Sequence, residues 1–235
     1  MDYNIPTLFV VSGPNGAGKS TYIKILLPPE LKDCKPFDRD KTRSTIENEL
    51  FGKTTDLTAD QKRQSQGDME TILQKEMVKA ASEKKHFVLE TPLSHPDYWR
   101  YIDFFANKGY LVQLSYMCLD SIKDCKMRVS KRVKEGGHNV DVHTIKGVYE
   151  MNLKYINEFR DTFKQISLYD GMKKPDLIAR LESGNVVRVE PLAFKKSWIK
   201  QGLTDIYNDL VRSGKEKSHL GIYKVENDQN QNLGR

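Results

Sequence analysis

The stretch Thr7-Leu-Phe-Val-Val-Ser-Gly-Pro-Asn-Gly-Ala-Gly-Lys-Ser-Thr21 decides the fold of this chain. A β-rich run at 7–11 leads directly into Gly13-Pro-Asn-Gly-Ala-Gly-Lys-Ser20, which matches the phosphate-binding pattern G-x-x-x-x-G-K-[ST]. A helix should begin near Lys19 and end before Pro28, because proline cannot continue a helix. The motif therefore lies between a strand and a helix, as a phosphate-binding loop requires, and it predicts an ATP or GTP site.

The chemistry of this loop predicts how a nucleotide would be held. Glycines allow the backbone to wrap around phosphates with its N–H groups facing inward, and the following helix adds its positive N-terminal end. We expect Lys19 to contact the β- and γ-phosphates and Ser20 to bind Mg²⁺, so that ATP and Mg²⁺ are the expected cofactors. The predicted nucleotide-binding residues are Gly13, Pro14, Asn15, Gly16, Ala17, Gly18, Lys19, Ser20 and Thr21.

Composition narrows the class of protein further. The 235 residues include 38 Lys and Arg against 32 Asp and Glu, and a hydrophobic share of 38% is enough for a folded core. The longest apolar run, 8–11, is far short of the ~20 residues that a membrane-spanning helix needs. Three cysteines without metal-binding spacing favour reduced thiols and a cytoplasmic location. The positive charge suits anionic ligands, but no nucleic-acid-binding signature accompanies it, so neither a membrane nor a nucleic acid is an expected partner.

Strand-like and helix-like runs alternate along most of the chain. Strands are predicted at 7–11, 35–38, 86–90, 110–119, 165–169 and 185–189, and a polar loop is expected after 38. The alternation predicts an α/β fold of the P-loop NTPase type, a three-layer sandwich with a mostly parallel sheet of about five to six strands and helices on both faces. We divide the chain into a P-loop domain, 1–192, and a C-terminal part, 193–235, with one helix at 198–211 and a polar tail.

Acidic side chains follow two neighbouring strands of this predicted sheet. Asp38 and Asp40 begin the segment after the second strand, and Glu90 ends the third. Open α/β sheets bind ligands at the edge where the carboxyl ends of their strands meet. An Asp there could accept a proton from an attacking hydroxyl, Arg43 could hold an anionic acceptor, and Glu90 could hold water on Mg²⁺ or contact substrate. The alternatives are a solvated charged loop and a glutamate that caps the next segment.

Two arginines on a predicted amphipathic helix form a further candidate site. Arg128 and Arg132 are four residues apart, so both project from one face of the helix. The Gly-Gly-His sequence that follows, 136–138, is typical of a lid that closes arginines over phosphates and excludes water. The alternative is a solvated basic helix face beside a histidine that packs in a loop.

Taken in order, five segments resemble the zeta toxin family of P-loop kinases, in particular its chromosomal branch described as predicted ABC-type ATPases. They are GPNGAGKST, Asp-x-Asp-x-x-Arg at 38–43, FVLET at 87–91, RVSKRVKEGGH at 128–138 and LYDGMKKPDLIA at 168–179. The resemblance implies that the 1–192 domain is a kinase that moves the γ-phosphate of ATP to a hydroxyl of a small-molecule sugar nucleotide, with UDP-N-acetylglucosamine as the family substrate. It also implies a separate antitoxin protein as a partner.

The resemblance assigns roles residue by residue. Asp40 matches the catalytic base, Arg43 follows it at the family's interval, and Glu90 matches the strand-end carboxylate near substrate and metal. The implied catalytic residues are Lys19, Asp40, Arg128 and Arg132, the implied substrate-binding residues are Asp40, Arg43, Glu90 and Thr91, and the implied metal ligands are Ser20 and Glu90.

Three departures from the family pattern leave alternatives open. Pro92 replaces a threonine, Lys146-Gly-Val148 stands where arginines usually precede the helix tyrosine, and Asp170-Gly-Met172 replaces Asp-Asn-Ser. One alternative is another small-molecule or nucleotide kinase, similar to chloramphenicol phosphotransferases. The other is an ATPase or nucleotide-gated binding protein without kinase activity.

Overall fold

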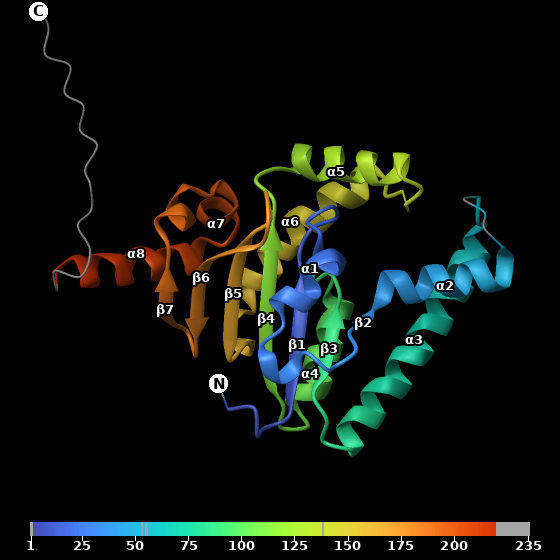
Figure 1. The fold of residues 1–235 in the computed structure, drawn as a ribbon, viewed down its shortest axis with the longest axis horizontal. Coiled ribbons are helices and arrows are strands. Elements are labelled where there is room, and N and C mark those ends of the chain that lie inside the picture. The colour runs from blue at the N-terminus through green and yellow to red at the C-terminus, as the bar shows by residue number, and fades with distance from the viewer. Residues whose placement is uncertain (1, 53, 55, 138, 220–235) are drawn as a thin grey trace, which may run out of the picture.

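The structure of the chain, a computed structural model, describes residues 2–52, 54, 56–137 and 139–219, with side chains described through 214. Within these residues seven strands form one sheet in the order β2-β3-β1-β4-β5-β6-β7 (Figure 1). The strands are β1 Thr7–Ser12, β2 Phe37–Asp38, β3 Phe87–Glu90, β4 Leu111–Cys118, β5 Gln165–Asp170, β6 Asp176–Glu182 and β7 Asn185–Val189. His138 and the end of the predicted polar tail, 220–235, lie outside the described residues.

The sheet confirms the predicted α/β fold with mostly parallel strands. Strands β1 to β5 pair in parallel, whereas β6 and β7 are antiparallel additions at one edge. The sheet exceeds the predicted number of strands because the sequence analysis does not predict β6. That strand reads DLIARLE, and its three charged residues hide the strand pattern. All five parallel strands end at the same edge of the sheet, and open α/β sheets bind their ligands at this edge.

Eight α-helices accompany the sheet in the described part of the chain. They are α1 Lys19–Leu26, α2 Arg39–Phe51, α3 Ala59–Ser82, α4 Trp99–Ala106, α5 Ile122–Lys134, α6 Val142–Glu158, α7 Ser197–Gly202 and α8 Thr204–His219. Short 3₁₀ helices lie at η1 Pro29–Leu31, η2 Pro96–Tyr98, η3 Arg160–Thr162 and η4 Pro191–Lys195. Across the described ranges, every helix is too short or too polar to cross a membrane.

Helices cover both faces of the sheet, as predicted. Helix α1 packs on one face, where Phe9 and Val11 of β1 belong to the same apolar cluster as Ile23 and Leu26 of α1. Figure 1 shows α1 in front of the sheet and α4 and α6 behind it. The second face carries the larger core, to which α3, α4, α6, α7 and α8 all contribute buried side chains. The result is the predicted three-layer sandwich.

The chain after residue 192 shares this larger core. Trp198 is 2% exposed and Leu210 is fully buried. The single helix predicted at 198–211 is wrong, because the backbone leaves helical geometry at Leu203 (φ −119°, ψ 56°) and separates α7 from α8. The division of the chain at 192 stays a prediction.

The polar loop predicted after β2 is wrong, because these residues form helix α2. Asp38 caps the helix by accepting a hydrogen bond from the Lys41 N–H at 3.0 Å. Only Arg39 and Ile46 of this helix are buried, so the sequence carries no apolar stripe that would indicate a helix. Instead α2 pairs with α3, and the two project together from the body of the protein (Figure 1).

A buried charged network fixes the start of α2. Arg39 is 5% exposed, and its Nη2 lies 2.5 Å from Glu70 Oε1 on α3. The guanidinium lies over the rings of Tyr98 and Tyr101, with its Cζ 4.5 and 5.2 Å from their centroids. Arg100 Nη2 lies 2.7 Å from Glu70 Oε2, and the Tyr101 hydroxyl donates to the same oxygen at 2.6 Å. Burial alone would raise the pKa of Glu70, but the hydrogen bonds from Tyr101 and Arg39 outweigh it and lower the pKa.

Replacing Arg39 should destabilise the fold, because it leaves Glu70 with fewer partners. Breaking a buried ion pair typically costs about 3–5 kcal/mol, and we expect Arg39→Met to fall near the lower end because Arg100 and Tyr101 still contact the carboxylate. Urea unfolding measures the effect. Arg63→Met, which breaks an exposed pair with Asp60, is the matched control and should leave the midpoint unchanged. Equal midpoints for both variants would contradict this account of α2.

Candidate active site

The phosphate-binding loop leaves β1 and packs against the end of β4. A Cβ atom at Gly13 would lie 2.1 Å from the Met117 carbonyl oxygen, so only glycine fits this approach. At Gly16 (φ +82°) a Cβ would lie 3.1 Å from the Arg128 Cβ of α5, and Gly18 (φ +92°) precedes α1 in a left-handed conformation. The loop is therefore held between β4, α5 and the N-terminus of α1, as a phosphate site requires.

The lysine of the motif lies along this loop. Lys19 Nζ donates hydrogen bonds to the carbonyl oxygens of Gly13 at 2.9 Å and Pro14 at 3.2 Å. Ala17 is fully buried, whereas Thr21 is exposed on α1 and its N–H donates to the Gly18 carbonyl. The structure thus brings the predicted loop residues together, with the ammonium group inside the loop and the Thr21 side chain facing solvent.

Ser20 lies between two carboxylates at the strand ends. Its hydroxyl is 2.8 Å from Glu90 Oε1 at the end of β3 and 3.3 Å from Asp38 Oδ2 at the end of β2. The sequence places Asp38 and Asp40 together at this edge, but the family resemblance assigns a role to Asp40 alone. The available signal was its place at the carboxyl end of a predicted strand next to the strand that carries Glu90.

The three side chains fit a Mg²⁺ ion that is held mainly by phosphates and water. Mg²⁺ prefers oxygen ligands and usually binds proteins through one or two carboxylates. Ser20, Asp38 and Glu90 offer one hydroxyl and two carboxylates. Among the residues that the structure describes, no group of three or more His, Cys, Asp or Glu side chains forms a metal cluster, so a dedicated all-protein metal cage is not found there.

Glu90 has an unusual proton affinity for a carboxylic acid. It is 7% exposed, and this burial raises its pKa to about 6 from 4.5. The charge of Lys19 and the hydrogen bond from Ser20 lower the pKa, while the charges of Asp38 and Asp40 raise it. These influences place Lys19, Asp38, Asp40 and Glu90 within one electrostatic cluster at the carboxyl edge of the sheet.

Asp40 and Arg43 occupy the first turns of α2. The Asp40 carboxylate is 66% exposed and lies 3.6 Å from Arg43 Nη2. Arg43 also lies 3.6 Å from the Glu47 carboxylate and donates a hydrogen bond to Gln66 on α3 at 3.4 Å. The predicted base is therefore accessible from solvent, and the predicted acceptor-binding arginine is held between α2 and α3.

Thr91 lies beneath this edge. It is 1% exposed, and its hydroxyl accepts a hydrogen bond from Arg39 at 3.3 Å and donates to the Pro92 carbonyl at 3.1 Å. In this structure the side chain joins β3 to α2. A direct contact with substrate stays a prediction.

The two predicted clamp arginines lie on α5, which crosses above the strand ends in Figure 1. Arg128 is half-buried beside Gly16, and its Nη2 donates a hydrogen bond to the Met172 carbonyl at 2.6 Å. Arg132 is exposed one turn further along the helix, where a Cβ at Gly137 would lie 2.5 Å from its Cγ. Arg128 is therefore already beside the loop, and a contact of Arg132 with phosphate stays a prediction.

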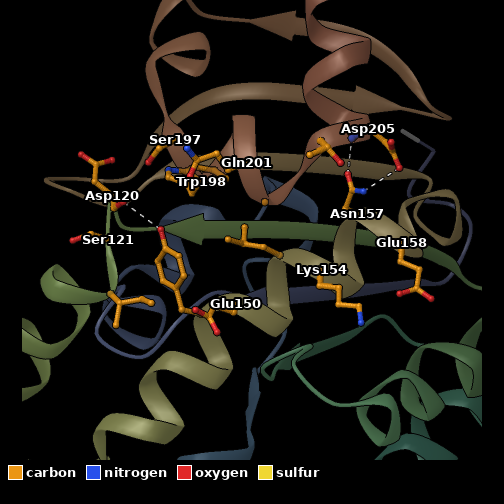
Figure 2. Close-up of a pocket in the computed structure, with 15 residues that line it drawn as sticks. Asp120, Ser121, Glu150, Lys154, Asn157, Glu158, Ser197, Trp198, Gln201 and Asp205 are labelled. Carbon is orange, nitrogen blue, oxygen red and sulfur yellow. Dashed lines mark hydrogen bonds between the residues drawn. The ribbon is translucent and has the colours of Figure 1, made fainter.

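A separate groove of about 790 Å³ lies between α6 and α7. Figure 2 shows Asp120 and Ser121 at one end and Asn157 with Asp205 at the other, where the two side chains are joined by a hydrogen bond. No residue of the phosphate-binding loop lines this groove, and no other predicted site residue does so. The groove does not belong to the phosphate site.

Comparisons with known proteins confirm the family resemblance that the motifs predict. A family model described as Zeta toxin matches residues 2–196. Among curated proteins, none matches the sequence significantly.

Three solved structures have similar folds at low sequence identity. The AvrRxo1-ORF1:AvrRxo1-ORF2 structure with sulphate ions has a TM-score of 0.63 and 15% identity, covering 94% of this chain and 77% of that chain. The AvrRxo1-ORF1:-ORF2 structure with ATP has a TM-score of 0.62 and 14% identity, covering 85% and 64%. A structure from the PezAT chromosomal toxin–antitoxin system of the human pathogen Streptococcus pneumoniae has a TM-score of 0.57 and 17% identity, covering 95% and 90%. At these identities the similarity shows the fold.

The raised pKa of Glu90 predicts that Glu90→Gln stabilises the metal-free protein. Because the folded-state pKa of about 6 exceeds the ordinary value of 4.5, the ionised carboxylate destabilises the folded state above pH 6. At pH 7.5 the variant should gain up to about 2 kcal/mol in the free energy of unfolding, and the gain should vanish as the pH falls through 6 toward 4. Urea unfolding with EDTA measures it.

The exposed Glu150, changed to Gln, is the control and should show no such pH-dependent gain. A Glu90→Gln variant less stable than the wild type at pH 7.5 would show that the carboxylate is not strained by burial.

Proposed function

The chain belongs to the Zeta toxin family, as its motifs predict, and from that premise we propose that it is an ATP-dependent kinase. It transfers the γ-phosphate of ATP to a hydroxyl of a small-molecule acceptor, with a UDP-N-acetyl sugar as the substrate. The observation that carries the proposal is the meeting of Ser20 with Asp38 and Glu90 beside the Lys19 loop. That arrangement brings groups that could bind phosphate, a metal ion and an acceptor together at one edge of the sheet.

The loop is the proposed site for the triphosphate of ATP. Its backbone N–H groups and the N-terminus of α1 attract phosphate oxygens, and Lys19 can leave the carbonyl oxygens of Gly13 and Pro14 for the β- and γ-phosphates. The fold neighbour solved with ATP supports this ligand. Bound Mg²⁺, held through Ser20, Asp38 and Glu90, would neutralise phosphate charge.

Asp40 is the proposed base for the acceptor. Its exposed carboxylate can take the proton of the acceptor hydroxyl as that oxygen bonds to the γ-phosphorus and the bond from phosphorus to the leaving ADP oxygen breaks. Arg43 is placed to hold an anionic part of the acceptor. Lys19, Arg128 and Arg132 neutralise the charge on the moving phosphoryl group.

A separate antitoxin protein is the proposed macromolecular partner. The fold neighbours include a structure from the PezAT chromosomal toxin–antitoxin system and a structure of AvrRxo1-ORF1 paired with AvrRxo1-ORF2. Family membership supports the same kind of pairing for this chain. The proposed location is cytoplasmic, in keeping with its three free cysteines.

Asp40→Asn tests the assignment of the base. We expect phosphoryl transfer to fall about 10²–10⁴-fold, because a neutral amide cannot accept the proton, while the affinity for Mg-ATP stays at the wild-type value. Radiolabelled transfer and calorimetry measure the two quantities. Asp60→Asn, an exposed change in α3, is the control. Near wild-type turnover in Asp40→Asn would remove Asp40 from the mechanism.

Mass spectrometry with Mg-ATP and UDP-N-acetylglucosamine tests the reaction itself. A product one phosphoryl group heavier than the sugar nucleotide supports the proposal, and Lys19→Met should abolish it because the triphosphate loses its charged contact. Phosphorylation of another small molecule in a metabolite pool would show that the proposed acceptor is wrong, and the kinase assignment would stand. ATP hydrolysis without any phosphorylated acceptor would overturn the kinase assignment.

A further inference from the structure

Lys196 is a buried lysine between η4 and α7. Its side chain is 8% exposed, and its Nζ lies 2.8 Å from both Asp120 Oδ1 and Asp170 Oδ2. Burial alone would lower the pKa of Lys196, but hydrogen bonds to the two carboxylates outweigh it and raise the pKa. The lysine is therefore charged, and it forms ion pairs with two carboxylates at once.

These carboxylates belong to the carboxyl ends of neighbouring strands. Asp120 follows β4, and Asp170 ends β5, where it pairs in register with Cys118. Without a cation between them, the two like charges would repel each other. Asp170 also accepts a hydrogen bond from the Met172 N–H at 3.1 Å, which fixes the turn after β5.

That turn contacts the phosphate-binding loop. A Cβ at Gly171 would lie 3.4 Å from the Ala17 carbonyl oxygen of the loop. The carbonyl of the next residue, Met172, accepts the hydrogen bond from Arg128, and a Cβ at Gly16 of the loop would lie 3.1 Å from the Arg128 Cβ. Continuous contacts thus run from Lys196 through the β5 turn to Arg128 and the loop.

We infer that Lys196 is a positioning residue for ATP binding, which holds the β5 turn so that Arg128 lies beside the phosphates. The inference rests on the proposed function, because it requires ATP in the 13–20 loop. Lys196 acts through Asp170 and Met172, and it lies outside the predicted phosphate and acceptor contacts. The C-terminal part of the chain therefore contributes to the nucleotide site.

Calorimetric titration with Mg-ATP tests the inference. Lys196→Met should weaken ATP affinity roughly 5- to 20-fold, the range expected when a coupled contact is removed. Lys195→Met removes the same charge from an exposed neighbour and should leave the affinity unchanged. Lys196→Arg keeps a cation for both carboxylates and should recover most of the loss.

A double-mutant cycle separates positioning from general destabilisation. If Lys196 acts through Arg128, adding Lys196→Met to Arg128→Gln should weaken ATP binding less than about twofold further. Full additivity of the two losses overturns the inference, and so does a folded Lys196→Met variant that binds ATP as the wild type does.

A further variant keeps the test valid if Lys196→Met alone fails to fold. Lys196→Met leaves the largely buried Asp170 unpaired, so Lys196→Met combined with Asp170→Asn removes the charge left behind. This variant should also bind ATP more weakly, and wild-type affinity in it overturns the inference. If the wild-type chain does not bind ATP, the proposed kinase function is wrong. If the wild-type chain binds ATP and the Lys196 variants bind it equally well, only the positioning role of Lys196 is wrong.

Discussion

The close approach of two glycine turns to the end of β4 is the constraint on which the site depends. Gly13 admits the Met117 carbonyl where a Cβ would lie 2.1 Å away, and a Cβ at Gly171 would lie 2.9 Å from the Met117 Cγ. The phosphate-binding loop and the β5 turn therefore contact the same strand end from two sides. Close-packed interiors have few alternative arrangements, so the backbone N–H groups of the loop are positioned before any phosphate arrives.

Charge balance is the second feature that shapes this edge. The carboxylates of Glu90, Asp38 and Asp40 lie near Ser20. The pKa of Glu90 is raised mainly by burial, and the negative charges of Asp38 and Asp40 raise it further. Arg39 lies between the two aspartates in sequence, yet its side chain turns inward to Glu70. The helix start is thus anchored by a buried cation, while Asp38 contacts Ser20 of the loop and Asp40 remains mostly exposed to solvent. Perturbed proton affinities of this kind are typical of functional sites.

Sequence reasoning predicts the parts of the molecule that depend on local pattern. The loop at 13–20 and the parallel strands follow from glycine spacing and apolar periodicity. The roles proposed for Lys19 and Ser20 rest on the same motif. Helix α2 could not be predicted in this way, because an ion pair replaces its apolar stripe. The same holds for Lys196, whose partner Asp120 is 76 residues away in the sequence. Residue spacing along the chain cannot indicate such an ion pair, because its two residues come together only when the strands assemble into the sheet.

The helices after Lys196 explain why its ion pairs with Asp120 and Asp170 can contribute to stability. An exposed lysine between two carboxylates contributes little, because water and salt screen the charges. Here Trp198 and Ile199 of α7, together with Ile206 and Leu210 of α8, bury the segment within the main core. The family match ends at 196, the lysine itself. The segment beyond the matched region therefore helps to bury Lys196 with Asp170, whereas Asp120 stays partly exposed. The packing of the C-terminal helices is thus linked to the ends of β4 and β5 beside the phosphate-binding loop.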